Sequence, residues 1–546
     1  MSIRSEVSAL AGFMRGLPGF LRLRITPEQA RAVVLRRMRE RESNFLASME
    51  RGVFGNPRSP YRAMLRMAGC ELGDIQRMLN ASGLEDTLRN LRSAGVYVSF
   101  EEFKGLRPIE RGGQIIPARA EDFDNPLLKN YHQVATGGST GASRRVTIDL
   151  DHLAAALPMR VLGDEFQRTL GVPGAFWFEI PPGNGLDSVL TRVPFSNVPE
   201  RWFTPVQGGR DGAALRFRLA THAIVSVARA SGARIPRPEY LPLDRAGVVA
   251  HWAADALRRR GACAIRTHVS KALRVCLAAW EDGIDLTGAV ICGGGEPPTP
   301  AKVAQIRRTG AQFFSGYHFT EVGTVGLSCT TSVDPNDQHL YMDHLALIQA
   351  PREVPGFQMS VQSFHFTTLL PTAPKFLLNA ESDDYGVVET RSCGCPFQEL
   401  GFTTHVRDIR SYRKLSGEGV TLIGSDMERI LEEDLPARFG GTPLDYQLVE
   451  EEDELGFTRL TIVVNPALPI PDERSVVDTV LAALTRSGPA AEMSRGIWSQ
   501  ANSLRVRRES PRLTRGGKMM PLQVSRRASA SPNVQPPKSS IGMNGR

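Results

Sequence analysis

The chain is poor in cysteine: only seven occur among 546 residues, an odd number scattered along its length. Such a set does not describe a disulfide framework, so we expect a protein of a reducing compartment, the cytoplasm. No stretch approaches the roughly 20 uninterrupted apolar residues that a membrane-spanning helix needs. Arginines interrupt the apolar patches near the N-terminus and no small-residue cleavage site follows them, so a secretory signal is not expected. Internal repeats are also absent from the sequence.

Most of the chain has nearly equal numbers of positive and negative side chains. The formal net charge is +8, but residues 501–546 carry ten lysines and arginines against one acid, Glu509, which gives +9. The first 500 residues therefore sum to −1, which does not describe a nucleic-acid-binding surface. The last segment, 523–546, is rich in Ser, Pro, Arg and Lys and has almost no large apolar residue. It is predicted to be a disordered basic tail.

What remains is the composition of a soluble globular protein, with 41% hydrophobic and 23% charged residues. Residues 145–330 alternate short apolar strands, such as 176–180 and 289–292, with segments whose apolar spacing predicts helices over 246–260 and 264–282. Strands that alternate with helices predict an α/β fold, with layers built around mainly parallel sheets. Ligands of such folds bind at the carboxyl ends of the strands.

The length of the chain predicts two or more domains. Beyond about residue 405 the pattern changes, and it predicts helices over 425–435 and 472–485 and strands over 445–450, 457–464 and 504–508. This is the pattern of a compact α+β unit. The predicted organisation is a helical N-terminal segment over 1–95, a core domain over 96–404, a C-terminal domain over 405–522 and the tail over 523–546.

Three short segments, far apart in the chain, combine glycines and hydroxyls with charged side chains. They are Ala135–Arg144 (ATGGSTGASR), Gly316–Glu321 (GYHFTE) and Pro511–Lys518 (PRLTRGGK). Glycines let backbone N–H groups surround a polyphosphate, and hydroxyls add donors without bulk. The carboxylate of Glu321 can hold Mg²⁺ through oxygen, and Lys518 can neutralise charge that develops on a transferred group. Together the three segments predict nucleotide chemistry.

In this order and spacing, the segments resemble the motifs of the adenylate-forming superfamily, which includes acyl-CoA synthetases, peptide-synthetase adenylation domains and luciferases. A fourth segment, Gly294-Gly295-Glu296-Pro297, is similar to the wall of the family's adenine pocket. The resemblance covers about residues 90–522, and its closest variants are phenylacetate-CoA ligases and acyl-protein synthetases. Ser143 stands where the family loop has proline, and Arg144 replaces its lysine but keeps the positive charge.

The resemblance implies a site that binds ATP and Mg²⁺. It assigns phosphate contacts to Thr136, Gly137, Gly138, Ser139, Thr140, Gly141 and Arg144, and the adenine pocket to Gly294, Gly295, Glu296 and Tyr317. It also implies that Thr320 touches phosphate and that Glu321 is the Mg²⁺ ligand. Lys518 would bridge the attacking carboxylate and the α-phosphate, from a mobile lid domain that rotates between two half-reactions.

The sequence leaves two assignments undecided, the ribose-binding aspartate and the hinge residue. The ribose-binding aspartate of the family corresponds to Asp383 or Asp384, and we favour Asp384 because its distance from the following cysteines suits the ligase pattern better. The hinge motif is eroded, and both Arg407-Asp408 and Arg410 lie in its window.

Four further residues have the donor types of a zinc site. Cys329, His339, Cys393 and Cys395 supply three thiols and one imidazole, the Cys₃His set of a tetrahedral Zn²⁺ site. Some phenylacetate-ligase-like proteins resemble this set, which implies a structural metal near the active site. The alternative is a group of ordinary buried cysteines, because Cys-x-Cys is a tighter pair than the usual Cys-x-x-Cys.

These features predict ATP-dependent activation of a small carboxylic acid through an acyl-adenylate, with release of pyrophosphate. The acyl group then passes to a thiol, with coenzyme A as the favoured acceptor and an acyl carrier protein or an amine as alternatives. Self-acylation is disfavoured because no cysteine follows Cys395. A non-catalytic nucleotide-binding protein is a further alternative, which the retention of Glu321 and Lys518 opposes. The phenylacetate-type resemblance also suggests a homodimer.

Overall fold

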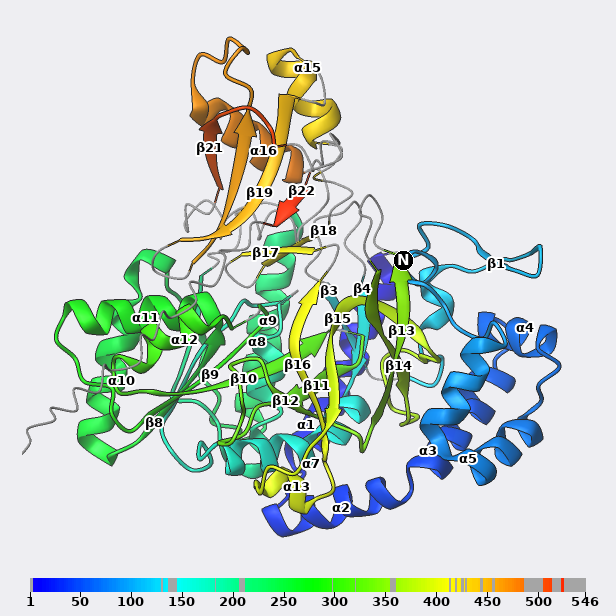
Figure 1. Ribbon diagram of the computed structural model, residues 1–546. Coiled ribbons are helices and arrows are strands. Elements are labelled where there is room, and N and C mark those ends of the chain that lie inside the picture. Colours follow the sequence, from blue (N-terminus) through cyan, green and yellow to red (C-terminus); the bar gives the residue numbers. More distant parts are fainter. Residues whose placement is uncertain are drawn as a thin grey trace, which may run out of the picture.

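The computed structural model describes residues 3–128, 131–135, 145–181, 183–205, 212–296, 298–319, 321–353, 360–411, 414–417, 420–423, 427, 430–441, 445–453, 457–485, 504–512 and 522–524. A wide sheet with helices on both faces forms the body of the molecule. A helical N-terminal segment runs along one side of this body, and a smaller unit stands at the end where the central strands finish (Figure 1).

Helices dominate the first hundred residues. They are α1 Ile3–Leu21, α2 Pro27–Arg39, α3 Arg41–Ser48, a π-helical turn Met49–Phe54, α4 Pro60–Met67, α5 Leu72–Ser93 and α6 Phe100–Phe103. Helix α2 begins at a capping box, in which Thr26 Oγ1 accepts from the backbone N–H of Gln29 and the Gln29 side chain accepts from that of Thr26. The apolar faces of α3, α4 and α5 form one core with strands of the main sheet, through residues such as Leu79, Leu88 and Phe364.

Twelve strands form the main sheet, in the order β13-β14-β15-β16-β12-β11-β10-β9-β8-β5-β6-β7. Its parallel half is β5 Gly174–Trp177, β6 Arg201–Thr204, β7 Pro238–Tyr240, β8 Cys263–His268, β9 Ala289–Gly294 and β10 Gln312–Phe319. Its antiparallel half is β11 Gly323–Leu327, β12 Gln338–Leu340, β13 Leu345–Glu353, β14 Ser360–Thr368, β15 Ala380–Thr390 and β16 Thr404–Ser411.

The predicted α/β class is confirmed, and the sheet is a mixed one. Parallel strands need a crossover connection, usually a helix, whereas antiparallel strands are joined by short turns. The chain carries such helices up to β10, but between residues 323 and 411 the described part of the chain has no long helix between strands. This is why the second half of the sheet is antiparallel.

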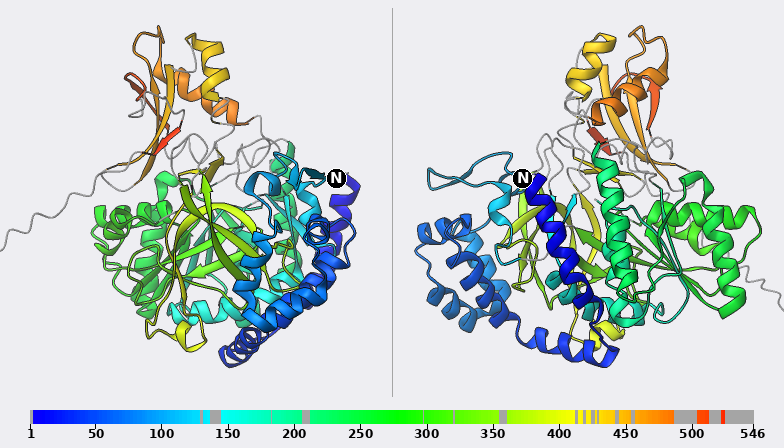
Figure 2. Two further views of the ribbon diagram at one scale, coloured as in Figure 1. Left: turned by 45° about the vertical axis from the view of Figure 1, so that its right-hand side comes forward. Right: turned by 180° about the vertical axis from the view of Figure 1, so that it is seen from behind.

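Helices cover both faces of the parallel half. On one face lie α7 Leu150–Phe166, α8 Gly185–Leu190 and α9 Gly212–Ala230 together with α1, and α1 and α9 run side by side (Figure 2). On the other face lie α10 Gly247–Arg260, α11 Val269–Glu281 and α12 Pro300–Arg307. The helix predicted over 264–282 is wrong in its first part, because 263–268 is strand β8, buried between β5 and β9. Among the described residues no helix is both long and apolar enough to cross a membrane.

Short elements lie outside the two larger sheets. They are the hairpin β1 Ile109–Arg111 and β2 Gln114–Ile116, the pair β3 Tyr131–Ala135 and β4 Arg145–Asp149, the pair β17 Lys414–Gly417 and β18 Val420–Ile423, helix α13 Pro396–Glu399, and 3₁₀ turns at Ala120–Phe123, Val193–Phe195 and Leu243–Arg245.

The C-terminal unit has its own four-stranded sheet, in the order β21-β20-β19-β22. Its elements are a π-helical turn Ile430–Asp434, α15 Leu435–Phe439, β19 Tyr446–Glu452, β20 Thr458–Val464, α16 Glu473–Thr485, β21 Leu504–Arg508 and β22 Leu522–Val524. Strands therefore occur where the sequence predicted them in this unit. Residues 404–411 form β16 of the main sheet, so we propose that the C-terminal unit begins after Ser411. The two units touch, because the guanidinium of Arg274 on α11 stands 4.7 Å from the centre of the Phe457 ring.

Candidate active site

The predicted nucleotide residues that the structure describes gather around the end of β10. Gly294 at the end of β9 pairs in register with Gly316 on β10, and His268 at the end of β8 pairs with Gly294. A Cβ atom on Gly316 would lie 2.5 Å from the ring of His318, so a side chain at this position would displace the imidazole. The carboxyl ends of β8, β9 and β10 share one edge of the sheet, which is where α/β sheets bind ligands.

Tyr317 and Asp384 lie together at this edge. The Tyr317 hydroxyl donates to Asp384 Oδ2 at 2.5 Å, and the phenol ring packs against Phe319 and Phe366. Burial, followed by the nearby Asp384 carboxylate, raises the pKa of Tyr317 well above its usual range, so the hydroxyl remains a donor. Asp383 accepts a hydrogen bond from Ser411 Oγ at 3.1 Å. Of the two candidate aspartates, Asp384 is thus the one bonded to the predicted adenine-binding tyrosine.

Glu321 follows β10 and is 6% exposed. Its Oε1 accepts a hydrogen bond from Lys104 Nζ at 2.5 Å, and both side chains are largely buried. Burial alone would raise the pKa of Glu321, but Lys104 outweighs it, with a smaller contribution from Lys375, and holds the pKa at about 2. The carboxylate is therefore ionised at neutral pH, as a Mg²⁺ ligand must be. No sequence signal marked Lys104 as its partner, since the two residues are 217 positions apart.

The Glu296 side chain points into the protein. Its carboxylate accepts from the backbone N–H of Ser270 at 2.8 Å and from the Ser270 hydroxyl at 2.6 Å, and Lys302 Nζ lies 3.4 Å away. Burial favours the neutral acid, but Lys302 and the two bonds from Ser270 lower the pKa of Glu296 below its ordinary value. Glu296 therefore ties the glycine turn after β9 to the first turn of α11. In this arrangement the backbone of Gly294 and Gly295 borders the open edge.

A buried ionic cluster, which sequence reasoning missed, lies beneath this turn. Glu179 accepts from Lys271 Nζ at 2.5 Å and contacts His268 Nε2 at 3.0 Å. Burial would raise the pKa of Glu179, but Lys271 and His268 lower it far below its usual range. A Cβ atom on Gly295 would lie 2.3 Å from His268 Nδ1, and Gly295 has φ +78°. Only glycine fits this position, for both reasons.

Both arginines of the hinge window lie on β16. Arg407 pairs with Glu389, with Nε 3.2 Å from Oε1, and Arg410 pairs with Asp408 at 2.7 Å. Asp408 has φ +51°, a left-handed conformation that marks a bend in the strand. These residues lie near the end of β16, whose last residue is Ser411. The choice of hinge residue stays a prediction.

Several predicted residues lie outside the described part of the chain. They are the phosphate-loop residues Thr136, Gly137, Gly138, Ser139, Thr140, Gly141 and Arg144, together with Thr320 and Lys518. The paired strands β3 and β4 flank the loop, with Ala135 opposite Arg145 in the register. The roles of these residues stay predictions.

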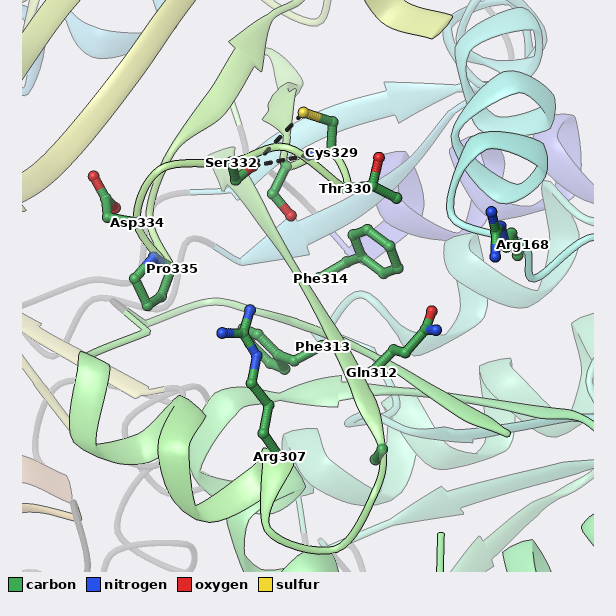
Figure 3. Close-up of a pocket in the computed structure, with 12 residues that line it drawn as sticks. Arg168, Arg307, Gln312, Phe313, Phe314, Cys329, Thr330, Ser332, Asp334 and Pro335 are labelled. Carbon is green, nitrogen blue, oxygen red and sulfur yellow. Dashed lines mark hydrogen bonds between the residues drawn. The ribbon is translucent and has the colours of Figure 1, made fainter. Parts of the chain in front are cut away.

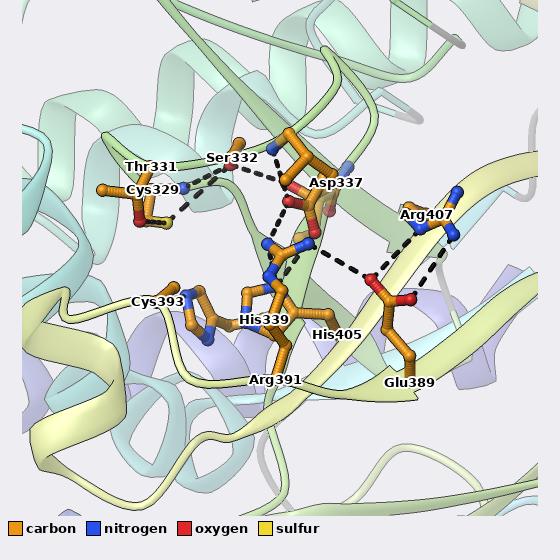
Figure 4. A network of polar contacts seen from close by, with 12 residues as sticks. Cys329, Thr331, Ser332, Asp337, His339, Glu389, Arg391, Cys393, His405 and Arg407 are labelled. Atoms are coloured by element: carbon orange, nitrogen blue, oxygen red, sulfur yellow. Dashed lines mark hydrogen bonds and ion pairs between the residues drawn. The ribbon is translucent and has the colours of Figure 1, made fainter.

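Three thiols and one imidazole lie within reach of one ion (Figure 4). The ligand atoms of Cys329, His339, Cys393 and Cys395 all lie within 4.8 Å of one another, and His339 Nε2 is 3.5 Å from Cys393 Sγ and 3.1 Å from Cys395 Sγ. Tetrahedral Zn²⁺ with ordinary bond lengths needs ligand atoms about 3.6–3.8 Å apart. The other ring nitrogen, His339 Nδ1, bonds the Phe402 carbonyl oxygen at 2.7 Å, which leaves Nε2 directed at the thiols. The donor set and its geometry therefore fit Zn²⁺.

A network of hydrogen bonds and ion pairs lies next to this cluster (Figure 4). Asp337 lies 2.9 Å from His405 Nδ1 and 2.5 Å from Arg391 Nη2, and the His405 ring packs 4.0 Å from that of His339. Burial would raise the pKa of Asp337, but the bonds to His405 and Arg391 hold it at about 2. Hydrogen bonding by Cys395 and then by His339 lowers the pKa of Cys329, and the same contact with Cys329 raises the pKa of Cys395.

A surface cavity of about 370 Å³ lies beside the cysteine cluster, at the other end of β10 from Tyr317 (Figure 3). Gln312, Phe313 and Phe314 from the start of the strand line it, and Arg168, Arg307 and Cys329 stand around it. None of the residues predicted to bind nucleotide lines this cavity.

No protein-family model matches the chain, and no curated protein matches it significantly. Among solved structures, 2-hydroxyisobutyryl-CoA ligase in complex with 2-HIB-AMP and coenzyme A, in the thioesterification state, is similar over 92% of this chain and 91% of its own. The TM-score is 0.51 and the sequence identity is 14%. Amide bond synthetase McbA from Marinactinospora thermotolerans is similar over 88% of this chain and 92% of its own, with a TM-score of 0.41 and 14% identity. The first likeness shows that the chain has the fold of an adenylate-forming ligase, as its motifs predicted.

Proposed function

We propose that this chain, which has the fold of an adenylate-forming ligase, activates a carboxylic acid with ATP and transfers the acyl group to the thiol of coenzyme A. The observation that carries the proposal is the meeting of Tyr317, Asp384 and Glu321 around one end of β10. Tyr317 and Glu321 belong to one motif and Asp384 to a second segment 67 positions after Tyr317, and Tyr317 and Asp384 are hydrogen-bonded to each other. A chance resemblance of isolated motifs would not bring them to one edge of the sheet.

The proposed reaction has two steps. In the first, a carboxylate oxygen of the acid attacks the α-phosphorus of ATP, the bond to the β-phosphate breaks, and acyl-AMP and pyrophosphate form. In the second, a deprotonated thiol attacks the acyl carbon and AMP leaves. Both reactants of the first step are anions, so the protein must position them and screen their charge. Arg144, the hydroxyls of the 136–144 loop and Lys518 are the proposed groups for this task.

Tyr317 and Asp384 are proposed to hold the nucleoside. The phenol ring offers an apolar face to adenine, and the oxygens of Asp384 can accept from ribose hydroxyls while Asp384 holds Tyr317 in place. Mg²⁺ would be held by Glu321, and when bound it would neutralise phosphate charge. Because Lys104 bonds one oxygen of that carboxylate, we propose that Lys104 keeps Glu321 ionised and oriented in the nucleotide-free enzyme.

Zn²⁺ is proposed at Cys329, His339, Cys393 and Cys395. Four protein donors fill a tetrahedral site and leave no position for substrate, so the metal would be structural. It would join the segment after β11, strand β12 and the segment after β15. A homodimer, an acyl carrier protein as partner and a location in the cytoplasm stay predictions from the sequence.

Pyrophosphate release tests the proposal directly. We expect acid-dependent release from Mg·ATP with a panel of aryl, short-chain and long-chain acids, and stimulation of turnover by coenzyme A. Lys518→Ala should lower release by about 100-fold or more and leave ATP binding within about threefold. Lys538→Ala removes the same charge from the tail and is the matched control. If only an amine or a carrier protein stimulates the release of pyrophosphate, that compound and not coenzyme A is the acceptor. If folded protein that binds ATP releases no pyrophosphate with any acid, the proposed activity is refuted.

A further inference from the structure

The surface cavity at the start of β10 is large enough to hold a small molecule. Its volume of about 370 Å³ is more than twice that of a cavity of roughly 150 Å³ that binds benzene, and pockets for small ligands begin at about 300 Å³. It lies at the opposite end of the strand from Tyr317, so a ligand in it would not overlap the nucleotide residues. We call this space the β10 cavity.

Two phenylalanines supply the apolar part of its wall. Phe313 and Phe314 are consecutive on β10, so their side chains point to opposite faces of the sheet. Phe313 belongs to the same core as Val303 and Ile306 of α12, and Phe314 therefore faces the side of α7. The cavity thus reaches around the first residues of the strand to both faces.

Each side of the cavity also has an arginine. Arg307 is the last residue of α12 and Arg168 follows the end of α7, and these helices lie on opposite faces of the sheet. Figure 3 shows the two side chains with Phe314 and Gln312 between them. Both arginines are exposed, and among the described residues neither guanidinium has a hydrogen-bond or ion-pair partner.

Positive charge exceeds negative charge around the cavity. Asp334 is the single acid among the lining residues, and its Oδ1 accepts from the backbone N–H of Asn336 at 2.6 Å. The two guanidinium groups and this one carboxylate give a net charge of +1. An anion could therefore bind to the arginines without displacing an existing ion pair.

Arg168 occupies a backbone position that favours glycine. Its φ is +58°, in the left-handed region. The N–H groups of Arg168 and Thr169 bond to the carbonyl oxygens of Glu165 and Asp164, at 2.9 and 2.7 Å. This is the Schellman motif that ends many helices, and its left-handed residue is usually glycine. Strained residues of this kind cluster at functional sites, and the end of α7 by itself does not require an arginine here.

We propose that the β10 cavity binds a small aromatic anion, a carboxylate or a phosphate ester, with Arg168 and Arg307 holding the charge and Phe313 and Phe314 contacting the ring. A guanidinium matches the oxygens of both anionic groups with two parallel N–H bonds. Phenylalanine rings pack favourably against another aromatic ring, either offset or edge to face. This inference does not rest on the proposed function, because none of the predicted nucleotide residues lines the cavity.

Titration calorimetry with matched probes tests the inference. The probes are 2-naphthoate against 2-naphthamide, phenyl phosphate against phenol, and inorganic phosphate alone, each titrated into the full chain at pH 7. At least one aromatic anion should bind about 10-fold or more tightly than both its neutral partner and inorganic phosphate. Binding of 2-naphthoate alone would identify a carboxylate site, and binding of phenyl phosphate alone would identify a phosphate-ester site.

Two substitutions locate the binding. Arg168→Gly and Arg307→Gln should each weaken the bound probe by about 3- to 10-fold, and the double variant by about 10-fold or more. Arg168→Gly should not lower the melting temperature, because glycine suits a φ of +58°, so its loss of binding would not reflect unfolding. Arg308→Gln is the matched control and should change the affinity by less than about twofold. Arg308 is the exposed neighbour of Arg307, but its guanidinium stands 4.3 Å from the centre of the Trp280 ring and does not line the cavity.

Three results would overturn the inference. They are equal affinity for the anions and their neutral partners, an unchanged affinity in the double variant, and no binding of either aromatic anion up to about 10 mM. Pyrophosphate release does not enter this test, so its outcome and that of the proposed function are independent.

Discussion

Replacing Lys104 by methionine should destabilise the protein in a pH-dependent way. Lys104 ends helix α6, and its ammonium lies 2.5 Å from Glu321 Oε1 and 5.2 Å from the centre of the Phe103 ring. Lys104→Met keeps the length of the side chain and most of its apolar contact. It removes the positive charge and leaves Glu321 buried without its closest partner.

The pKa of Glu321 sets the magnitude. A displacement from 4.5 to about 2 corresponds to roughly 3 kcal/mol, at about 1.4 kcal/mol for each pH unit. Lys375 supplies part of this effect and remains in the variant, so we expect a loss of about 2 kcal/mol. Because the pKa is lowered in the folded state, the stabilisation is fully present above pH 4.5 and disappears as the pH falls through about 2.

A double-mutant cycle measures this contribution. Wild type, Lys104→Met, Glu321→Gln and the double variant would be compared by urea denaturation at pH 7 and near pH 3. We expect a coupling free energy of about 2 kcal/mol at pH 7 and a much smaller one at pH 3. A coupling below about 0.5 kcal/mol at pH 7, in the range of exposed ion pairs, would refute the reasoning, as would one that does not change with pH.

Three shorter predictions concern the nucleotide edge and the cysteine cluster. Tyr317→Phe should raise KM for ATP by about 3- to 10-fold through loss of the bond to Asp384, with KM for the acid unchanged; an unchanged KM for ATP would remove Tyr317 from the nucleotide site. Gly316→Ala should cost about 1–3 kcal/mol of stability, because its Cβ would lie 2.5 Å from His318, and an unaltered melting temperature would contradict that close packing. Purified enzyme should contain one zinc per chain by elemental analysis, and both chelation and His339→Ala should remove it and lower the melting temperature; metal-free wild type that is equally stable would exclude the zinc site.

Sequence reasoning located the residues that motifs carry and missed those that only the fold brings together. Glycine runs and the Tyr-x-x-Thr-Glu pattern identified Tyr317 and Glu321, and the donor types identified the four residues of the cysteine cluster. Lys104 lies in a segment without a motif, and only the pairing of distant strands and helices brings it to Glu321. No local pattern could have predicted that contact.

One wrong element concealed the ion pair between β8 and α7. Residues 264–268 have apolar spacing that also suits a helix, and with that assignment Arg266 appears to be a surface residue of an amphipathic helix. In the structure they belong to β8, where alternate side chains point to opposite faces, and Arg266 and His268 face α7 and the glycine edge. Pairing with β5 and β9 decided the conformation, and this information is non-local.

A very short strand lies within the antiparallel half of the main sheet. Strand β12 has three residues, and it joins β11 through Gly326 and Leu327 and β16 through Val406 and His405. In the strand order, Tyr317 on β10 lies on one side of β12 and Asp384 on β15 lies on the other. A small slip or opening of β12 would therefore separate these two residues without unfolding the strands on either side. His339 lies within β12, and Cys329 and the Cys393–Cys395 pair lie after β11 and β15, so the proposed Zn²⁺ would hold these three segments in one alignment.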